Sequence, residues 1–101
     1  MNLIEIASLK SMCSKLGMDY VFMRNNEIHM RFSISADIDL IRVLQAIKKH
    51  PDKLRMQGGN PPTLIFFSIY KSTSPEDMLR GAVQIMEKVV EDYLSNEQEE
   101  E

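Results

Sequence analysis

The chain has 101 residues, a formal net charge of -3, 44% hydrophobic residues and 27% charged residues, which is typical of one compact soluble domain. It has neither an apolar run of the roughly 18 residues that span a bilayer nor the pattern of a signal peptide, so we expect a cytoplasmic protein with no membrane partner. Its single cysteine, Cys13, excludes an internal disulfide and a metal site built from several thiolates. A domain of this size has little room for a deep pocket, and 12 basic against 15 acidic residues argue against simple electrostatic binding of nucleic acid.

An amphipathic helix is predicted from Leu3 to Leu16, because four apolar residues recur at spacings of three and four. These residues are Ile6, Leu9, Cys13 and Leu16. Gly17 is expected to end this helix, since glycine readily adopts the left-handed backbone that often follows a last helical turn.

A β-hairpin is predicted next. Its first strand spans Met18 to Arg24, and its turn is Asn25-Asn26, a pair that tolerates positive φ. In the second strand apolar residues alternate with polar ones, which is typical of a strand with one face in the core. The apolar residues are Ile28, Met30, Phe32 and Ile34, and the polar ones are Glu27, His29, Arg31 and Ser33. We therefore expect a sheet with one face in contact with solvent.

A second helix is predicted before Pro51, which stops it because the residue before a proline disfavours helical geometry. Asp37 is the preferred N-cap, and Ser35 is a weaker candidate. The expected buried stripe is Leu40, Leu44 and Ile47, supported by Ile41 and Val43. Three basic residues are expected in the last turn, where they complement the helix dipole. They are Lys48, Lys49 and His50.

A second strand pair is predicted from Lys53 to Gln57 and from Thr63 to Ile69, joined by the glycine- and proline-rich turn 58–62. The run Leu64 to Phe67 shows no alternation with polar residues. We expect this last strand to be central in the sheet and covered on both faces.

The clearest local signal begins the third helix, with Ser74 as N-cap and Pro75 in the first position. Its apolar residues keep spacings of three and four, and Gly81 is its weak point. They are Leu79, Ala82, Met86, Val89 and Tyr93. After Leu94 the sequence is acidic and has no apolar residue, so 95–101 are predicted to be a disordered tail. Without the four glutamates of this tail the net charge becomes about +1.

The predicted order is helix, hairpin, helix, hairpin, helix (α-β-β-α-β-β-α). Paired hairpins favour a four-stranded antiparallel or mixed sheet with the three helices gathered mainly on one face. The sequence therefore predicts an α+β domain rather than a doubly wound one.

No catalytic or metal-binding motif stands out in the sequence. Cys13 lies on the apolar stripe of the first helix and is interpreted as a buried structural residue. His29 belongs to the polar face of a strand and His50 to a helix end, and no HxxxH, CxxC or HExxH spacing links either to a metal. Gly58-Gly59 matches neither common phosphate-binding loop and is interpreted as a turn. A free-standing enzyme is therefore the least favoured hypothesis, and no cofactor is expected for this chain.

The main local excess of basic residues comprises Lys48, Lys49, His50, Lys53 and Arg55. This cluster is a candidate contact for nucleic acid or for an acidic protein surface. Helix-end chemistry already accounts for its first two members. No aromatic residue interleaves with it in the sequence, as a surface that stacks bases would need.

Several apolar and glycine positions resemble, in their order and spacing, the C-terminal domain of the bacterial transcription-repair coupling factor (Mfd). The positions are Asn2-Leu3, Ile6-Ala7, Leu9-Lys10, Leu16-Gly17, Ile28, Phe32, Asp37, Leu54-Arg55, Gly58-Gly59, Leu64 and Phe66. The resemblance covers nearly the whole chain before the acidic tail. The family's segment E-L-x-D-R-F-G, expected before the Asn-Leu pair, is missing, so Met1 is interpreted as a start within a longer protein and no contact residue is carried over.

The resemblance implies that residues 1–94 are the C-terminal regulatory domain of an ATP-dependent DNA translocase that removes stalled RNA polymerase and recruits nucleotide excision repair. ATP and Mg²⁺ would belong to the motor domains of that bacterial parent, and this chain would be non-catalytic. Its direct partner would be the UvrB-like N-terminal module, where it masks the surface that binds UvrA. UvrA, RNA polymerase and DNA would be reached only through the parent.

Eight charged or titratable side chains are candidate partner contacts. Glu27, His29 and Arg31 belong to the open sheet face, and Glu5 and Lys10 to the first helix. The alternative hypothesis is a small nucleic-acid-binding or protein-interaction module that uses the basic cluster, and its candidates are Lys49, Lys53 and Arg55.

Overall fold

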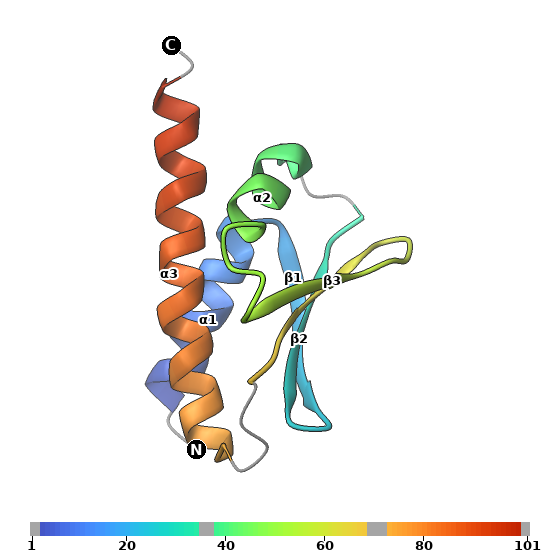
Figure 1. The fold of residues 1–101 in the computed structure, drawn as a ribbon, viewed down its shortest axis with the longest axis vertical. Helices are drawn as coiled ribbons and strands as arrows, with labels where there is room; N and C mark the ends of the chain where they lie inside the picture. Colours follow the sequence, from blue (N-terminus) through green and yellow to red (C-terminus); the bar gives the residue numbers. More distant parts are fainter. Residues whose placement is uncertain (1–2, 35–37, 69–72, 100–101) are drawn as a thin grey trace.

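The protein folds into two layers, with three helices on one face of a four-stranded sheet (Figure 1). The computed structural model describes residues 3–34, 38–68 and 73–99. The elements are α1 (Leu3–Lys15), β1 (Met18–Arg24), β2 (Glu27–Phe32), α2 (Leu40–Ile47), β3 (Leu54–Gln57), β4 (Thr63–Phe66) and α3 (Pro75–Glu99). The predicted α+β class and element order are confirmed. Among the described residues no helix is both long and apolar enough to cross a membrane.

The strands lie in the order β1-β2-β4-β3, and all three neighbouring pairs are antiparallel. β4 therefore joins the two hairpins, because it pairs with β2 on one side and with β3 on the other. Its Ile65 faces His29 of β2 and Arg55 of β3. The prediction that β4 is a central strand is confirmed.

The first half of the chain follows the local sequence signals closely. Gly17 has φ 82° just after α1, and Asn25 and Asn26 have φ 51° and 60° in the hairpin turn, as a type I′ turn requires. The prediction for Ile34 is wrong: β2 ends at Phe32, and Ile34 lies beyond it with its side chain 84% exposed. Alternation alone could not show where pairing with β1 stops.

The start of α2 differs from the prediction. Asp39 is the N-cap, and its carboxylate accepts a hydrogen bond from the backbone N–H of Arg42. Asp37 was therefore the wrong choice, and it lies with Ser35 outside the described residues. Two aspartates two residues apart are equally suited to capping, so only the packed position of the helix decides between them.

The buried face of α2 consists of Val43, Ala46 and Ile47, so the prediction is confirmed for Ile47 and Val43, whereas Leu44 is only half-buried. Leu40 and Ile41, in the first turn, are 38% and 69% exposed. Both candidate stripes have helical spacing, and the face turned toward α3 decides which one is buried. The helix ends at Ile47 with Lys48 as C-cap, so Lys49 and His50 lie beyond its last turn rather than within it.

The second hairpin is slightly shorter than predicted. β3 begins at Leu54 rather than Lys53, and β4 ends at Phe66. One further hydrogen bond, from the backbone N–H of Phe67 to the carbonyl of Lys53 at 3.0 Å, extends the pairing. Ile69, the predicted strand end, lies outside the described residues.

The start of α3 is as predicted: the Ser74 hydroxyl accepts a hydrogen bond from the backbone N–H of Asp77 at 3.1 Å, and Pro75 follows the cap. The expected disordered tail differs from the structure, because α3 continues as a helix to Glu99. Glu and Gln are good helix formers, and extending an existing helix needs no new nucleation. Glu100 and Glu101 lie outside the described residues.

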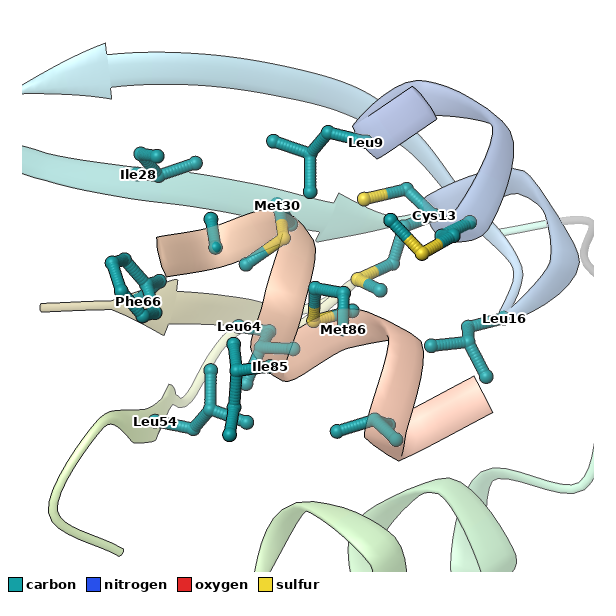
Figure 2. Close-up of a cluster of buried hydrophobic side chains, with 14 of the residues drawn as sticks. Leu9, Cys13, Leu16, Ile28, Met30, Leu54, Leu64, Phe66, Ile85 and Met86 are labelled. Atoms are coloured by element: carbon teal, nitrogen blue, oxygen red, sulfur yellow. The ribbon is translucent and has the colours of Figure 1, made fainter. Parts of the chain in front are cut away.

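The core lies between the helices and the sheet. Figure 2 shows Leu9 and Cys13 of α1 and Met86 of α3 directed toward the strand residues Met30 and Leu64. All five side chains are at most 1% exposed. The predicted stripe of α3 is confirmed, since Leu79, Ala82, Met86 and Val89 are buried and Tyr93 packs against the core.

Gly81 allows α3 to approach the ring of Phe66 closely. A Cβ atom at this position would lie 3.0 Å from Cζ of that ring. Alanine is favoured over glycine in a helix by about 1 kcal/mol, but overpacking a core costs about 1–3 kcal/mol. We expect Gly81→Ala to lower the free energy of unfolding, measured by urea titration, in the wild-type protein. In the Phe66→Leu variant, which lacks the ring, we expect the same substitution to raise it. Equal effects in the two backgrounds would contradict this explanation.

Cys13 is fully buried, and desolvation raises the pKa of its thiol from 9.0 to about 12. Above pH 9.0 the unfolded chain releases the thiol proton while the folded protein retains it. The stabilisation is therefore complete below pH 9.0 and is lost as the pH rises toward 12, by at most about 1.4 kcal/mol per pH unit. Urea titrations at several pH values between 9 and 12 give the free energy of unfolding as a function of pH. We expect this free energy to fall less steeply with pH for Cys13→Ala than for the wild type. An identical pH dependence would show that the Cys13 thiol does not cause the loss of stability.

Candidate functional site

The face of the sheet that is turned away from the helices carries the candidate site, and we call it the outer face (Figure 1). Side chains alternate along a strand, and the core uses Ile28 and Met30 of β2 and Leu64 and Phe66 of β4. The opposite positions form the outer face. They are Tyr20, Phe22 and Arg24 of β1, Glu27, His29 and Arg31 of β2, Thr63 and Ile65 of β4, and Arg55 and Gln57 of β3.

Ile65 lies at the centre of the outer face and is 1% exposed. No described helix lies over this face (Figure 1). The residues that face Ile65 across the sheet are His29 and Arg55, so we attribute its burial to side chains of the neighbouring strands. The prediction that β4 is buried on both faces is confirmed. The expectation that one face of the sheet is in contact with solvent is therefore wrong at Ile65.

Three rings form a continuous row over β1 and β2. The centroids of Tyr20 and Phe22 are 5.4 Å apart, and the His29 ring stacks on Phe22 at 4.8 Å with an interplanar angle of 16°. The guanidinium carbon of Arg31 lies 5.5 Å from the centroid of Tyr20. This distance is within the range of a cation–π interaction, so the Arg31 guanidinium packs on Tyr20 at the end of the row.

A second group reaches across β4 beside Ile65, from Arg55 of β3 to Glu27 of β2. Nη2 of Arg55 donates to Oε2 of Glu27 at 2.7 Å, and the same guanidinium lies 5.4 Å from the centroid of the Phe67 ring. Nε2 of His29 is 3.3 Å from Oε1 of Glu27 but does not meet hydrogen-bond geometry. Because the Arg55 side chain is about half exposed, the ion pair contributes at most about 1 kcal/mol. Its effect is mainly to hold the guanidinium in place.

The structure gathers half of the predicted contact residues in one place and separates the others. Glu27, His29, Arg31 and Arg55 lie together on the outer face. Glu5 lies in α1 and faces Arg80 of α3 at 3.9 Å. Lys10 lines a surface pocket between α1 and β1, which Tyr20 also lines.

The basic cluster does not form one surface. Lys49 pairs with Asp92 of α3 at 2.7 Å, on the helical side of the molecule, whereas Arg55 belongs to the outer face. Lys53 is exposed just before β3. No aromatic residue interleaves with the cluster in the sequence, but in the structure the ring of Phe67 lies beside Arg55.

The aromatic residues of the outer face were missed in the sequence. A signal for two of them was present, because the Asn25-Asn26 turn fixes the hairpin register. That register places Tyr20 opposite Arg31 and Phe22 opposite His29. The contact of Arg55 with Glu27 had no such signal, since it depends on the order of the strands in the sheet.

The outer face has the chemistry of a binding surface. It offers aromatic rings and guanidinium groups, which stack and form charge-assisted hydrogen bonds. Cys13 lies in the core on the opposite side of the sheet. Within the described ranges, no group of three or more His, Cys, Asp or Glu residues could hold a metal ion.

Comparisons with protein-family models, with curated proteins and with solved structures found no match.

The burial of Ile65 can be tested by removing its side chain. We expect Ile65→Ala to lower the free energy of unfolding by about 2–4 kcal/mol, as for a buried isoleucine of the core. Gln57→Ala, an exposed position on the same face, is the matched control and should change stability by less than about 0.5 kcal/mol. Urea titration measures both; a small effect of Ile65→Ala would mean that its cover is not tightly packed.

Proposed function

We propose that this chain is a non-catalytic binding domain that engages a macromolecular partner through the outer face. The observation that carries the proposal is the group of rings and arginines on a sheet face that no described element covers. Tyr20 is 55% exposed although it packs against both Phe22 and Arg31. Exposed aromatic residues and arginines are the types that contribute most to binding surfaces.

The outer face is also held in place before a partner arrives. Arg31 is fixed over Tyr20, and Arg55 is fixed by Glu27 and Phe67. Arginine loses considerable rotamer freedom when it is immobilised in an interface. Side chains that are already positioned lose less on binding, which supports a role in recognition.

The resemblance to the transcription-repair coupling factor gives this proposal its specific form. The partner is then the UvrB-like module of a bacterial, cytoplasmic parent protein, and the domain masks the surface that binds UvrA. ATP-dependent translocation on DNA belongs to the motor of that parent, and this chain needs no cofactor of its own.

The positions that carry the resemblance are mostly structural. Leu9, Ile28, Leu64 and Phe66 are buried in the core. Such positions support a common fold and do not make partner contacts. Of the positions that carry the resemblance and that the structure describes, Arg55 is the one that lies on the outer face. The identity of the partner therefore rests on the resemblance, and the choice of surface rests on the rings and arginines.

The experiment is an isothermal titration in which calorimetry measures the affinity of the chain for a purified UvrB-like module. We expect Arg31→Glu and Arg55→Glu each to weaken binding by about ten-fold or more, because a charge reversal in a contact surface leaves like charges facing each other. Lys15→Glu is the matched control, since Lys15 is an exposed residue at the end of α1 on the helical side. Circular dichroism checks that the variants are folded.

Two outcomes separate the parts of this proposal. If the wild-type chain does not bind the module, the specific form drawn from the resemblance is wrong. If the module binds and the outer-face variants bind as tightly as the Lys15→Glu control, the outer face is not the contact surface.

A further inference from the structure

We propose that the outer face takes a single-stranded nucleic acid, with bases stacked on its exposed rings and phosphates held by its arginines. This inference rests on the proposed function for its choice of surface, the outer face, and assigns to that surface a ligand other than the UvrB-like module. The observation that carries it is the pairing of rings with guanidinium groups on both sides of Ile65. Bases of single-stranded nucleic acids stack on aromatic side chains and on arginine planes.

The row of rings provides a place for bases. Tyr20 is the most exposed of the three rings, and Phe22 and His29 continue the row across β1 and β2. The two stacked rings support each other and leave Tyr20 as the ring most open to a ligand. Stacking on such a ring tolerates any base, because every base has a π-face.

The charge of the outer face complements a phosphate backbone. Three arginines belong to it, Arg24, Arg31 and Arg55, against one carboxylate, Glu27, which already accepts a hydrogen bond from Arg55. Asp19 lies in the β-bulge between Met18 and Tyr20, and the three guanidinium groups outnumber the carboxylates even if Asp19 is counted. The face is thus cationic in a chain whose net charge is -3. A polyanion with flat bases suits both its charge and its rings.

The dimensions of the sheet set the length of the ligand. Four strands spaced about 4.8 Å apart give a width of about 14 Å from β1 to β3. Tyr20 and Arg31 lie on β1 and β2 at one side of this width, Arg55 lies on β3 at the other, and Phe67 directly follows β4 between them. One class of RNA-binding domain stacks two or three bases on the rings of a four-stranded sheet, and by that measure we infer a short footprint that crosses the strands.

The test measures fluorescence anisotropy of labelled oligouridine and oligothymidine with the whole chain at about 50 mM salt, where phosphate contacts are strong. We expect Tyr20→Ala to weaken binding by roughly ten-fold or more, because it removes a stacking ring. Tyr20→Phe keeps the ring and should bind within roughly two-fold of the wild type. Tyr20→Leu is a second variant that fills the space without a ring and should bind as weakly as Tyr20→Ala.

The arginines are tested by the salt dependence of the same binding. Each phosphate contact contributes a slope of about -0.7 to the logarithm of the binding constant against the logarithm of the salt concentration. We expect Arg31→Gln and Arg55→Gln each to make the slope shallower by about this amount. Lys15→Gln, on the helical side, should leave the slope unchanged.

Three outcomes overturn the inference. The first is an absence of oligonucleotide binding at low salt, and the second is equal affinity for a duplex and a single strand. The third is that heparin binds as tightly as the oligonucleotides and that Tyr20→Leu does not weaken oligonucleotide binding. This result would show that the face attracts any polyanion. If the chain binds no oligonucleotide, but binds the UvrB-like module and loses that binding in the Arg31→Glu variant, the inference fails while the proposed function stands.

Discussion

The structure depends on the burial of β4 on both faces. Leu64 and Phe66 fill the space beneath the helices, and Ile65, between them in sequence, is equally inaccessible on the outer face. Because β4 pairs with β2 and β3, it also joins the two hairpins into one sheet. A strand in this position cannot shift by one residue without exchanging Ile65 with its neighbours and moving the phenylalanine ring away from Gly81. Its register therefore fixes the helical layer and the outer face together.

The outer face follows from the need to cover Ile65 without a second layer of helices. The residues beside it are not small polar ones but His29 and Arg55, whose side chains are long or flat enough to lie over an apolar neighbour. Each is held by further contacts, His29 by the Phe22 ring and Arg55 by Glu27. The same contacts that shield an apolar side chain thus produce a rigid surface of rings and charges.

Local signals predicted most elements, because they act within a few residues. The Asn25-Asn26 turn and the Ser74 cap depend on neighbouring backbone groups alone, and both are found as predicted. The choice between Asp37 and Asp39, the buried face of α2 and the exposed Ile34 depend on packing against distant elements, and there the sequence was ambiguous. The candidate site was even harder to predict from the sequence. Glu27 and Arg55 are 28 residues apart in sequence, and they meet only because both flanking strands pair with β4.

The ion pair between Arg55 and Glu27 has a consequence for which ligands the surface accepts. The two residues come from strands on either side of β4 and meet across it, so their contact lies beside the position of Ile65. A ligand that draws the guanidinium away must itself shield the isoleucine from water, or the complex exposes an apolar side chain. A small hydrated anion cannot provide that shield, whereas a flat or apolar group can. In the proposed complex, Ile65 therefore disfavours ligands that offer charge without an apolar or flat surface.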